Sequence, residues 1–300
     1  MKTALRLLTR LAALLLVLAV LVFGLAWFRS EQARNRKYEL PRLTLEATAT
    51  PARIARGEHL ARTRGCTGCH GPSLLGERMI DAGPVMQVYT PNLTPGGVLA
   101  AHDLASFEHA LRHAVARDGR PLLVMPAEDF ALLSNEDVIA LFVYLKQLAP
   151  ASATQPASHI GPLGRVLYLF GQLPVWKAES VDHALASRGA PAPPARADVA
   201  YGAYVAQGCI GCHGATLAGG HIPGTPPDFV AAANLTPHAD ALGRWSEADF
   251  LRAMREGVRP DASPINPFMP WRDLRQMDDI ELRALWAYLR SLPAVAPTAP

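Results

Sequence analysis

All four cysteines of the 300-residue chain lie in two five-residue motifs that end in histidine. The motifs are Cys66-Thr67-Gly68-Cys69-His70 and Cys209-Ile210-Gly211-Cys212-His213. In a C-x-x-C-H sequence the two thiols can add to the vinyl groups of a haem, and the adjacent histidine can bind the iron. A zinc site or a redox-active C-x-x-C pair is the alternative interpretation, but the histidine in both copies favours haem attachment. The sequence therefore predicts two haem c groups, attached through Cys66, Cys69, Cys209 and Cys212.

The axial iron ligands are expected from two histidines and two methionines. His70 and His213 are predicted as the proximal ligands because of their place in the motif. Met125 lies 55 residues after His70, Met269 lies 56 residues after His213, and each is followed by a proline that stiffens the loop. Met254 and Met277 align with leucines in the other copy and are interpreted as packing residues. Five further histidines remain alternative ligands: His102, His109, His113, His221 and His238.

This ligand set restricts the chemistry. Iron that is held by histidine and methionine has no open position, so no substrate can bind it and only electrons pass. The chain is therefore predicted to be an electron-transfer protein and not an enzyme on its own. A dihaem peroxidase or an enzyme of the thiosulfate dehydrogenase type is the alternative, and it would need one iron with a displaceable ligand. A fixed subunit of a haem-copper oxidase is a further alternative.

The two motifs belong to an internal repeat with an offset of 142–144 residues. Each copy has about 95 residues and is expected to be helical throughout, because no window alternates as a convincing strand would. Helices are expected over 54–64 and 199–207, before the two haem motifs, and at the end of each copy. Residues suited to begin helices are Asp103, Ser134, Ser246 and Asp278. The matching segments are Asn92-Leu93-Thr94-Pro95 with Asn234-Leu235-Thr236-Pro237, Phe107 with Phe250, Met125-Pro126 with Met269-Pro270, and Tyr144-Leu145 with Tyr288-Leu289.

The expected organisation is all-α, with two tandem domains after an N-terminal transmembrane helix. Between the domains, short apolar stretches at 166–170 and 175–176 are expected to dock on one or both of them. Trp245 precedes a capped helix and could donate to a haem propionate, or it could simply pack in the core. The predicted segments are an anchor at 1–30, a juxtamembrane linker at 31–50, domain 1 at 51–149, a linker and strap at 150–196, domain 2 at 197–293, and a disordered tail at 294–300.

The N-terminus carries 18 uncharged residues, 11–28, preceded by Lys2, Arg6 and Arg10. As a helix this run is about 27 Å long, which is just enough to cross a bilayer. A cleaved signal peptide is the alternative, with Gly24-Leu25-Ala26 as a possible cleavage site. The length of the run favours an uncleaved anchor, with Trp27 at the membrane interface.

The charge distribution argues against a nucleic-acid partner. Residues 51–149 hold nine Lys/Arg against ten Asp/Glu, and residues 197–293 hold eight against eleven. The net charge of +3 therefore comes from the N-terminal segment and the linker. Neither haem-bearing stretch offers a basic face.

With these motifs, the chain resembles a membrane-anchored dihaem class I c-type cytochrome. Both copies are similar to the cytochrome c subunits of bacterial membrane-bound alcohol and gluconate dehydrogenases, through C-x-x-C-H, N-L-T-P, a capped helix containing phenylalanine, M-P and a closing helix ending in Y-L. Those subunits usually carry three haems, whereas this chain has two motifs. The resemblance implies a single-pass protein of the bacterial cytoplasmic membrane with its haem domains in the periplasm. It also implies redox partners: a dehydrogenase or quinol as donor, and a cytochrome, quinone or terminal oxidase as acceptor.

Overall fold

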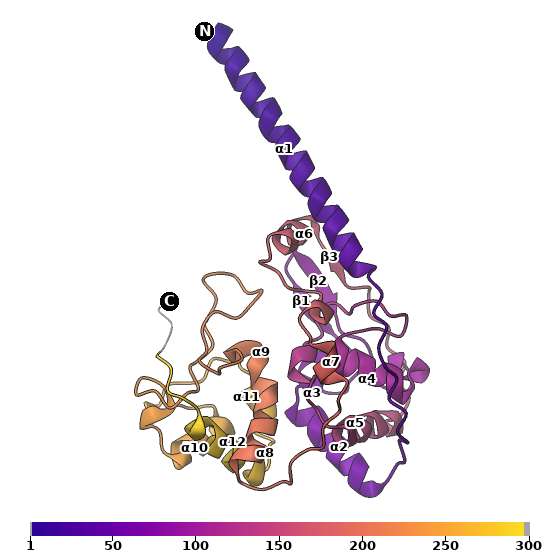
Figure 1. Ribbon diagram of the computed structural model, residues 1–300, viewed down its shortest axis with the longest axis vertical. Coiled ribbons are helices and arrows are strands. Elements are labelled where there is room, and N and C mark those ends of the chain that lie inside the picture. The colour runs from indigo at the N-terminus through magenta and orange to yellow at the C-terminus, as the bar shows by residue number, and fades with distance from the viewer. Residues whose placement is uncertain (1, 297–300) are drawn as a thin grey trace.

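The computed structural model describes residues 2–296, which form a long N-terminal helix and two helical domains joined by an extended connection (Figure 1). Helix α1, Lys2–Arg34, projects away from domain 1 and is long and apolar enough to cross a membrane, a test that a signal sequence also passes. The helix continues four residues beyond the boundary expected at residue 30. Its apolar side chains are exposed along most of its length.

Domain 1 is built on two packed helices, α2 and α5, with the haem-attachment turn following α2 directly. A short antiparallel sheet and several single-turn helices fill the connections. The elements are α2 (Pro51–Thr63), α3 (Cys66–His70), β1 (Arg78–Asp81), β2 (Met86–Tyr89), η1 (Val98–Ala101), α4 (Leu104–His113), η2 (Ala127–Asp129) and α5 (Asn135–Gln147).

Domain 2 repeats this plan, with α8 packed on α12 as α2 packs on α5. The repeat inferred from the sequence is therefore a repeat of structure, and the mostly helical fold class is confirmed. The elements are α8 (Val199–Val205), η4 (Ala206–Cys209), α9 (Ile210–His213), η5 (Leu242–Arg244), α10 (Glu247–Glu256), α11 (Trp271–Leu274) and α12 (Asp279–Ser291).

Helix starts fall where the capping residues predict them. Asp103 and Ser246 begin α4 and α10, and each forms a reciprocal capping box with the residue three positions later. Ser134 caps α5 through the Asp137 backbone N–H, and Asp278 caps α12 in the same way. These caps satisfy amide groups that the helices leave without partners, and so they fix the entry of the helices that frame each haem motif.

Two glycines allow the principal helix pairs to approach closely. A Cβ atom added to Gly57 would lie 2.0 Å from the Ala140 carbonyl oxygen, and one added to Gly202 would lie 1.9 Å from that of Ala284. Both distances are far inside van der Waals contact. A side chain at either position would therefore force α2 away from α5, or α8 away from α12.

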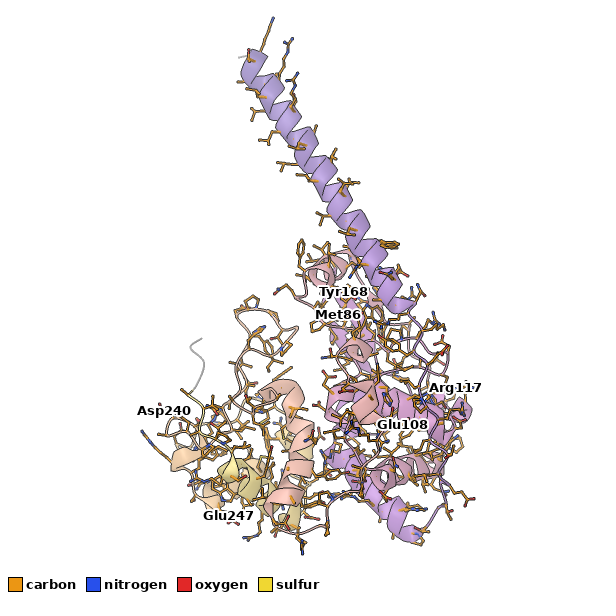
Figure 2. All side chains as sticks on the ribbon, viewed as in Figure 1. Met86, Glu108, Arg117, Tyr168, Asp240 and Glu247 are labelled. Carbon is orange, nitrogen blue, oxygen red and sulfur yellow. The ribbon has the colours of Figure 1, made fainter. Side chains whose placement is uncertain are left out.

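The connection between the domains docks on domain 1 and on α1. Its strand β3, His159–Ile160, pairs with β2, and Trp176 is buried in a small core with Met86 and Val88. Its helix α6, Pro162–Leu169, lies beside α1, where Arg165 pairs with Glu31 at 2.7 Å (Figure 1). The connection is completed by η3 (Lys177–Glu179) and α7 (His183–Ala186). Figure 2 places Tyr168 of α6 near the base of α1.

Two expectations need correction here. The three-stranded sheet was not expected, because its strands have two to four residues, too few for alternation to stand out from the sequence. The tail expected to be disordered from residue 294 is held at Val295, whose carbonyl accepts from Asn234 Nδ2 at 2.7 Å and whose N–H donates to Thr236 Oγ1 at 3.1 Å. Residues 297–300 lie outside the described residues.

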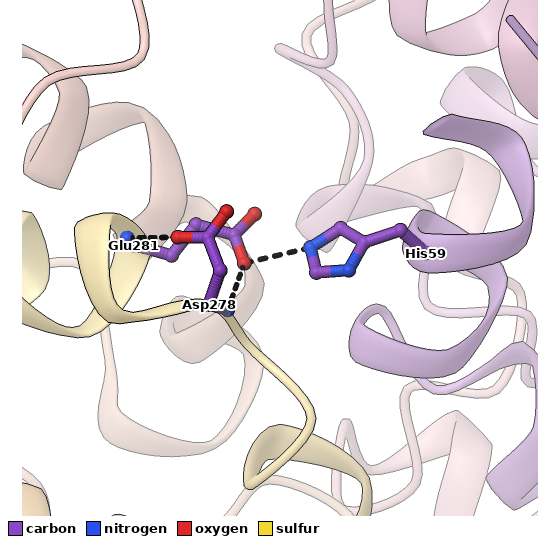
Figure 3. A group of neighbouring side chains, drawn as sticks. All are labelled: His59, Asp278 and Glu281. Atoms are coloured by element: carbon purple, nitrogen blue, oxygen red, sulfur yellow. Dashed lines mark hydrogen bonds and ion pairs between the residues drawn. The ribbon is translucent and has the colours of Figure 1, made fainter. Parts of the chain in front are cut away.

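The domains meet through a buried polar interface with approximate two-fold symmetry. On one side His59 Nε2 of α2 lies 2.7 Å from Glu281 Oε2 at the start of α12 (Figure 3). On the other side the Tyr204 hydroxyl of α8 donates to Asp137 Oδ2 at 2.7 Å, at the start of α5. His59 and Tyr204 sit at matching places in the repeat, and so do Asp137 and Glu281. Arg56 ties the two sides together, with a bidentate pair to Asp137 at 2.9 Å and a contact to Glu281 at 3.4 Å.

Candidate haem sites

One large cavity, of about 1350 Å³, is lined by both cysteine-histidine motifs and by both methionine-proline loops. Its walls are mostly apolar, with Phe107 and Leu141 from domain 1 and Phe250 and Leu285 from domain 2. All eight residues predicted to attach haem or to bind iron line this cavity: Cys66, Cys69, His70, Met125, Cys209, Cys212, His213 and Met269. The structure thus brings together, in each domain, groups that are 55 or 56 residues apart in the sequence.

Both motif histidines are oriented by backbone carbonyl groups. His70 Nδ1 lies 2.9 Å from the Pro91 carbonyl oxygen, and His213 Nδ1 lies 2.7 Å from that of Ala233. Because a carbonyl can only accept, each Nδ1 carries the proton and each Nε2 keeps a free lone pair. Burial lowers the pKa of both His70 and His213, which keeps the rings neutral, as a metal ligand must be.

The carbonyl acceptors belong to the loops that precede the two N-L-T-P segments. In domain 1 the Asn92 side chain accepts from the Thr94 N–H at 2.8 Å and donates to the Ala151 carbonyl at 2.7 Å. In domain 2 the Asn234 side chain makes the same pair of contacts, with Thr236 and Val295. These asparagines shape the loop behind each histidine, and Asn92 itself is buried.

All four cysteines lie at the wall of the cavity, where Cys66, Cys69 and Cys209 are half-buried and Cys212 is exposed. Burial raises the pKa of the Cys66 thiol to about 12 and that of Cys209 to about 12. Redox-active C-x-x-C pairs need the opposite shift, toward a stable thiolate. This difference weighs against a redox C-x-x-C pair.

The methionine loops turn in the same way in both domains. The Met125 carbonyl accepts from the Ala127 N–H at 2.8 Å, and the Met269 carbonyl accepts from the Trp271 N–H at 2.8 Å. The proline between them has the negative φ and positive ψ of an inverse γ-turn. The ring of proline fixes φ in this range, so the Met-Pro sequence itself specifies the turn that presents each methionine to the cavity.

The loop of domain 1 has an additional restraint from the connection between the domains. Val124, directly before Met125, has φ +66, a conformation that is unfavourable for a β-branched residue. Its N–H donates to the Val175 carbonyl at 2.8 Å, beside the buried ring of Trp176. The strap therefore supports the methionine loop of domain 1, a role that the sequence did not reveal.

Of the five histidines considered as alternative ligands, one lines the cavity and four do not. His102 lines it, while His109, His113, His221 and His238 are not among the lining residues. His109 bonds to the Pro41 carbonyl, and His113 is fully buried against His183 and Glu108. His113, considered as an alternative iron ligand, therefore lies in a buried polar cluster of domain 1 and not at the cavity. Figure 2 shows Glu108 inside this domain.

The two positions considered for haem propionates differ between the domains. Trp245 packs against the core and is not among the residues that line the cavity, so its propionate contact stays a prediction. His102 occupies the matching place in domain 1, and its buried Nδ1 has no hydrogen-bond partner among the described residues. Arg117, labelled in Figure 2, also lines the cavity and lowers the pKa of His102 in addition to the larger effect of burial. The unpartnered Nδ1 of His102 and the nearby guanidinium of Arg117 suit an anionic haem propionate. This pair of residues was not predicted from the sequence.

These features fit a covalently attached haem in each domain: a pair of thiols at the cavity wall, a neutral histidine with a free Nε2, a methionine facing the same space, and apolar walls. The fold and the site are similar to those of c-type cytochromes. In agreement, the sequence profile of the cytochrome c family matches residues 199–293, which are therefore a cytochrome c domain and imply haem c.

Over most of its length the chain is homologous to cytochrome c subunits of dehydrogenases. It is 30% identical over 278 residues to the gluconate 2-dehydrogenase cytochrome c subunit of Pantoea cypripedii, covering 82% of this chain and 61% of that protein. It is 30% identical over 290 residues to the cytochrome c subunit of the quinone alcohol dehydrogenase of Gluconobacter oxydans, covering 82% and 56%. A diheme cytochrome c-type protein of Cereibacter sphaeroides is 26% identical over 272 residues, covering 80% and 86%. The chain thus spans about three fifths of the length of the dehydrogenase subunits that it matches.

Proposed function

We propose that the chain is a dihaem c-type cytochrome that passes electrons from a dehydrogenase, or from quinol, to an acceptor of the respiratory chain. The observation that carries this proposal is the single cavity lined by both C-x-x-C-H motifs and both Met-Pro loops. Its homology to cytochrome c subunits of gluconate and alcohol dehydrogenases supports a dehydrogenase as donor. Helix α1 would hold the chain in the cytoplasmic membrane, with both domains in the periplasm.

Each domain contributes the same set of residues to its haem. Haem c, when bound, supplies an iron that gains and loses one electron. The cysteines tether the macrocycle, and the carbonyls of Pro91 and Ala233 hold His70 and His213 with Nε2 free to bind. Met125 and Met269 would supply the second iron ligand in each domain, and a thioether ligand would favour the reduced state more than a second histidine would. The apolar walls exclude water, which limits structural change between oxidation states.

The haem content tests this proposal directly. The full chain, produced with the cellular machinery for haem attachment and purified in detergent, should gain the mass of two haems and give a pyridine haemochrome value of two per chain. Replacing both cysteines of one motif, as in Cys209→Ala with Cys212→Ala, should leave one. The matched variant of domain 1, Cys66→Ala with Cys69→Ala, should also leave one. A single haem in the unmodified chain would contradict the proposal.

The ligand assignment is tested separately. The oxidised protein should be low-spin and should show the near-infrared charge-transfer band of methionine-bound iron. Replacing Met125 or Met269 by alanine should each remove about half of that band, whereas Met86→Leu, in the small core beside the connection, should leave it intact. A high-spin iron that binds cyanide or peroxide at rest would favour the enzymatic alternative instead.

A further inference from the structure

Two aspartates occupy the same position in the two repeats, four residues after each candidate methionine. Asp129 ends the single-turn helix η2, and Asp273 lies in α11. The backbone of each aspartate is hydrogen-bonded to the proline that follows the methionine. The Asp129 N–H donates to the Pro126 carbonyl at 3.0 Å, and the Asp273 N–H donates to the Pro270 carbonyl at 3.0 Å. The loop that presents each methionine therefore also aims a carboxylate.

Each carboxylate reaches the haem-attachment turn of the other domain. Asp129 Oδ1 accepts from the Gly211 N–H, inside the second motif, at 2.9 Å. In the reciprocal position, a Cβ atom added to Gly68 of the first motif would lie 2.6 Å from Asp273 Oδ2. A Cβ atom added to Gly211 would similarly lie 2.7 Å from Asp129 Oδ1. Glycine in the third position of both C-x-x-C segments thus leaves room for a carboxylate from the partner domain.

Both carboxylates are half-buried where they lie against the haem-attachment turns. Burial raises the pKa of Asp129 to about 6 and also raises that of Asp273. The other charged groups near Asp129 are Glu128, Lys177 and Arg64. Arg64 itself crosses the interface and donates to the Val205 carbonyl at 2.9 Å.

We propose that Asp129 and Asp273 are reciprocal positioning residues, each of which lies against the haem-attachment turn of the other domain and sets part of the potential of the haem attached there, with Asp129 also hydrogen-bonded to that turn. The inference rests on the two-haem function proposed above. A negative charge beside a haem favours the ferric state, so each carboxylate lowers the potential of the haem across the interface. The methionine loop of one domain is thereby coupled to the haem of the other.

The test is a potentiometric titration of the full chain in detergent at pH 7.5, where Asp129 is ionised. The background variant Met269→His marks the second haem, because exchanging methionine for histidine lowers its potential and separates the two steps. On this background the lower reduction step belongs to the second haem and the upper step to the first. Asp129→Asn should shift the lower step to higher potential and leave the upper step unchanged. Asp273→Asn should shift the upper step only. Glu136→Gln, an exposed carboxylate on α5 of domain 1, is the charge-matched control and should move neither step.

Asparagine keeps an oxygen that can accept from Gly211, so these variants remove charge and preserve the turn. Gly211→Ala provides the complementary change, since it displaces the Asp129 carboxylate without altering its charge, and it should shift the same step as Asp129→Asn. If each aspartate moves the step of its own domain, or both steps equally, or neither, the inference is wrong while the two-haem function stands. If the unmodified chain carries one haem, the proposed function itself has failed.

Discussion

The interface between the domains makes a quantitative prediction for the single hydroxyl group of Tyr204. This group donates to Asp137 Oδ2 at 2.7 Å and accepts from the Ser134 N–H at 3.0 Å. Ser134 is fully buried and Asp137 is 5% exposed, so water cannot replace either contact. A hydrogen bond to a buried charge contributes about 1.5–3 kcal/mol, and an orphaned buried N–H costs about 1–3 kcal/mol. Because the two contacts share one group and are not additive, Tyr204→Phe should lower the free energy of unfolding by about 2–4 kcal/mol at pH 7.

The effect should also depend on pH. Burial pulls the pKa of Asp137 upward, but Arg56 and the Tyr204 hydroxyl hold it below the ordinary value. A carboxyl with a depressed pKa stabilises the fold above its unfolded pKa of about 3.9, and this stability is lost as the pH falls through the folded value. The difference between Tyr204→Phe and the unmodified protein should therefore shrink below about pH 4.

The measurement is guanidinium unfolding of the full chain, followed by circular dichroism at pH 7 and at pH 3.5. Tyr288→Phe on α12 is the matched control, since its ring is half-buried and its hydroxyl makes no hydrogen bond among the described residues. A loss below about 0.5 kcal/mol at pH 7, or a loss equal to that of the control, would refute this account of the interface.

Three further predictions concern packing, acid stability and the strap. Gly202→Ala should lower the free energy of unfolding by at least about 2 kcal/mol, because its Cβ would lie 1.9 Å from the Ala284 carbonyl oxygen. Gly24→Ala is the control: it has open space around it and should leave the free energy of unfolding unchanged or raise it. The full chain should lose stability as the pH falls below about 4.5, because His59 and Arg56 hold the pKa of Glu281 below its ordinary value despite its burial; urea midpoints that rise on acidification would contradict this. Trp176→Ala should cost about 3 kcal/mol and should weaken the methionine charge-transfer band of the first haem before that of the second; equal loss of both would show that the strap does not support the loop before Met125.

Much of the fold could be predicted because the sequence carries it locally. The capping residues Asp103, Ser134, Ser246 and Asp278 begin helices for reasons confined to one turn, and all four do so in the structure. The internal repeat located the second copy of each motif without any other protein for comparison. The repeat singled out Met125 and Met269 as candidate ligands, because only these two of the seven methionines occur in both copies. The cavity does not make this distinction, since Met79, Met254 and Met277 also line it.

The features that could not be predicted depend on contacts between distant segments. Nothing in the sequence near Gly211 shows that the carboxylate of Asp129 will lie against it, 82 residues away. The support of Val124 by the strap and the burial of His113 against His183 have the same origin. The short strands escaped notice because they have only two to four residues, and because β3 on the strap pairs with β2, which is distant in the sequence.

The central claim is that both irons are closed by histidine and methionine and serve only to carry electrons. A potentiometric titration of the full chain, followed by visible and near-infrared absorption together, tests it most directly. The account predicts two one-electron steps, both from low-spin ferric haem, with the methionine charge-transfer band disappearing in parallel with the reduction of each haem. A high-spin ferric signal at rest, or a reduction step that leaves that band unchanged, would contradict it.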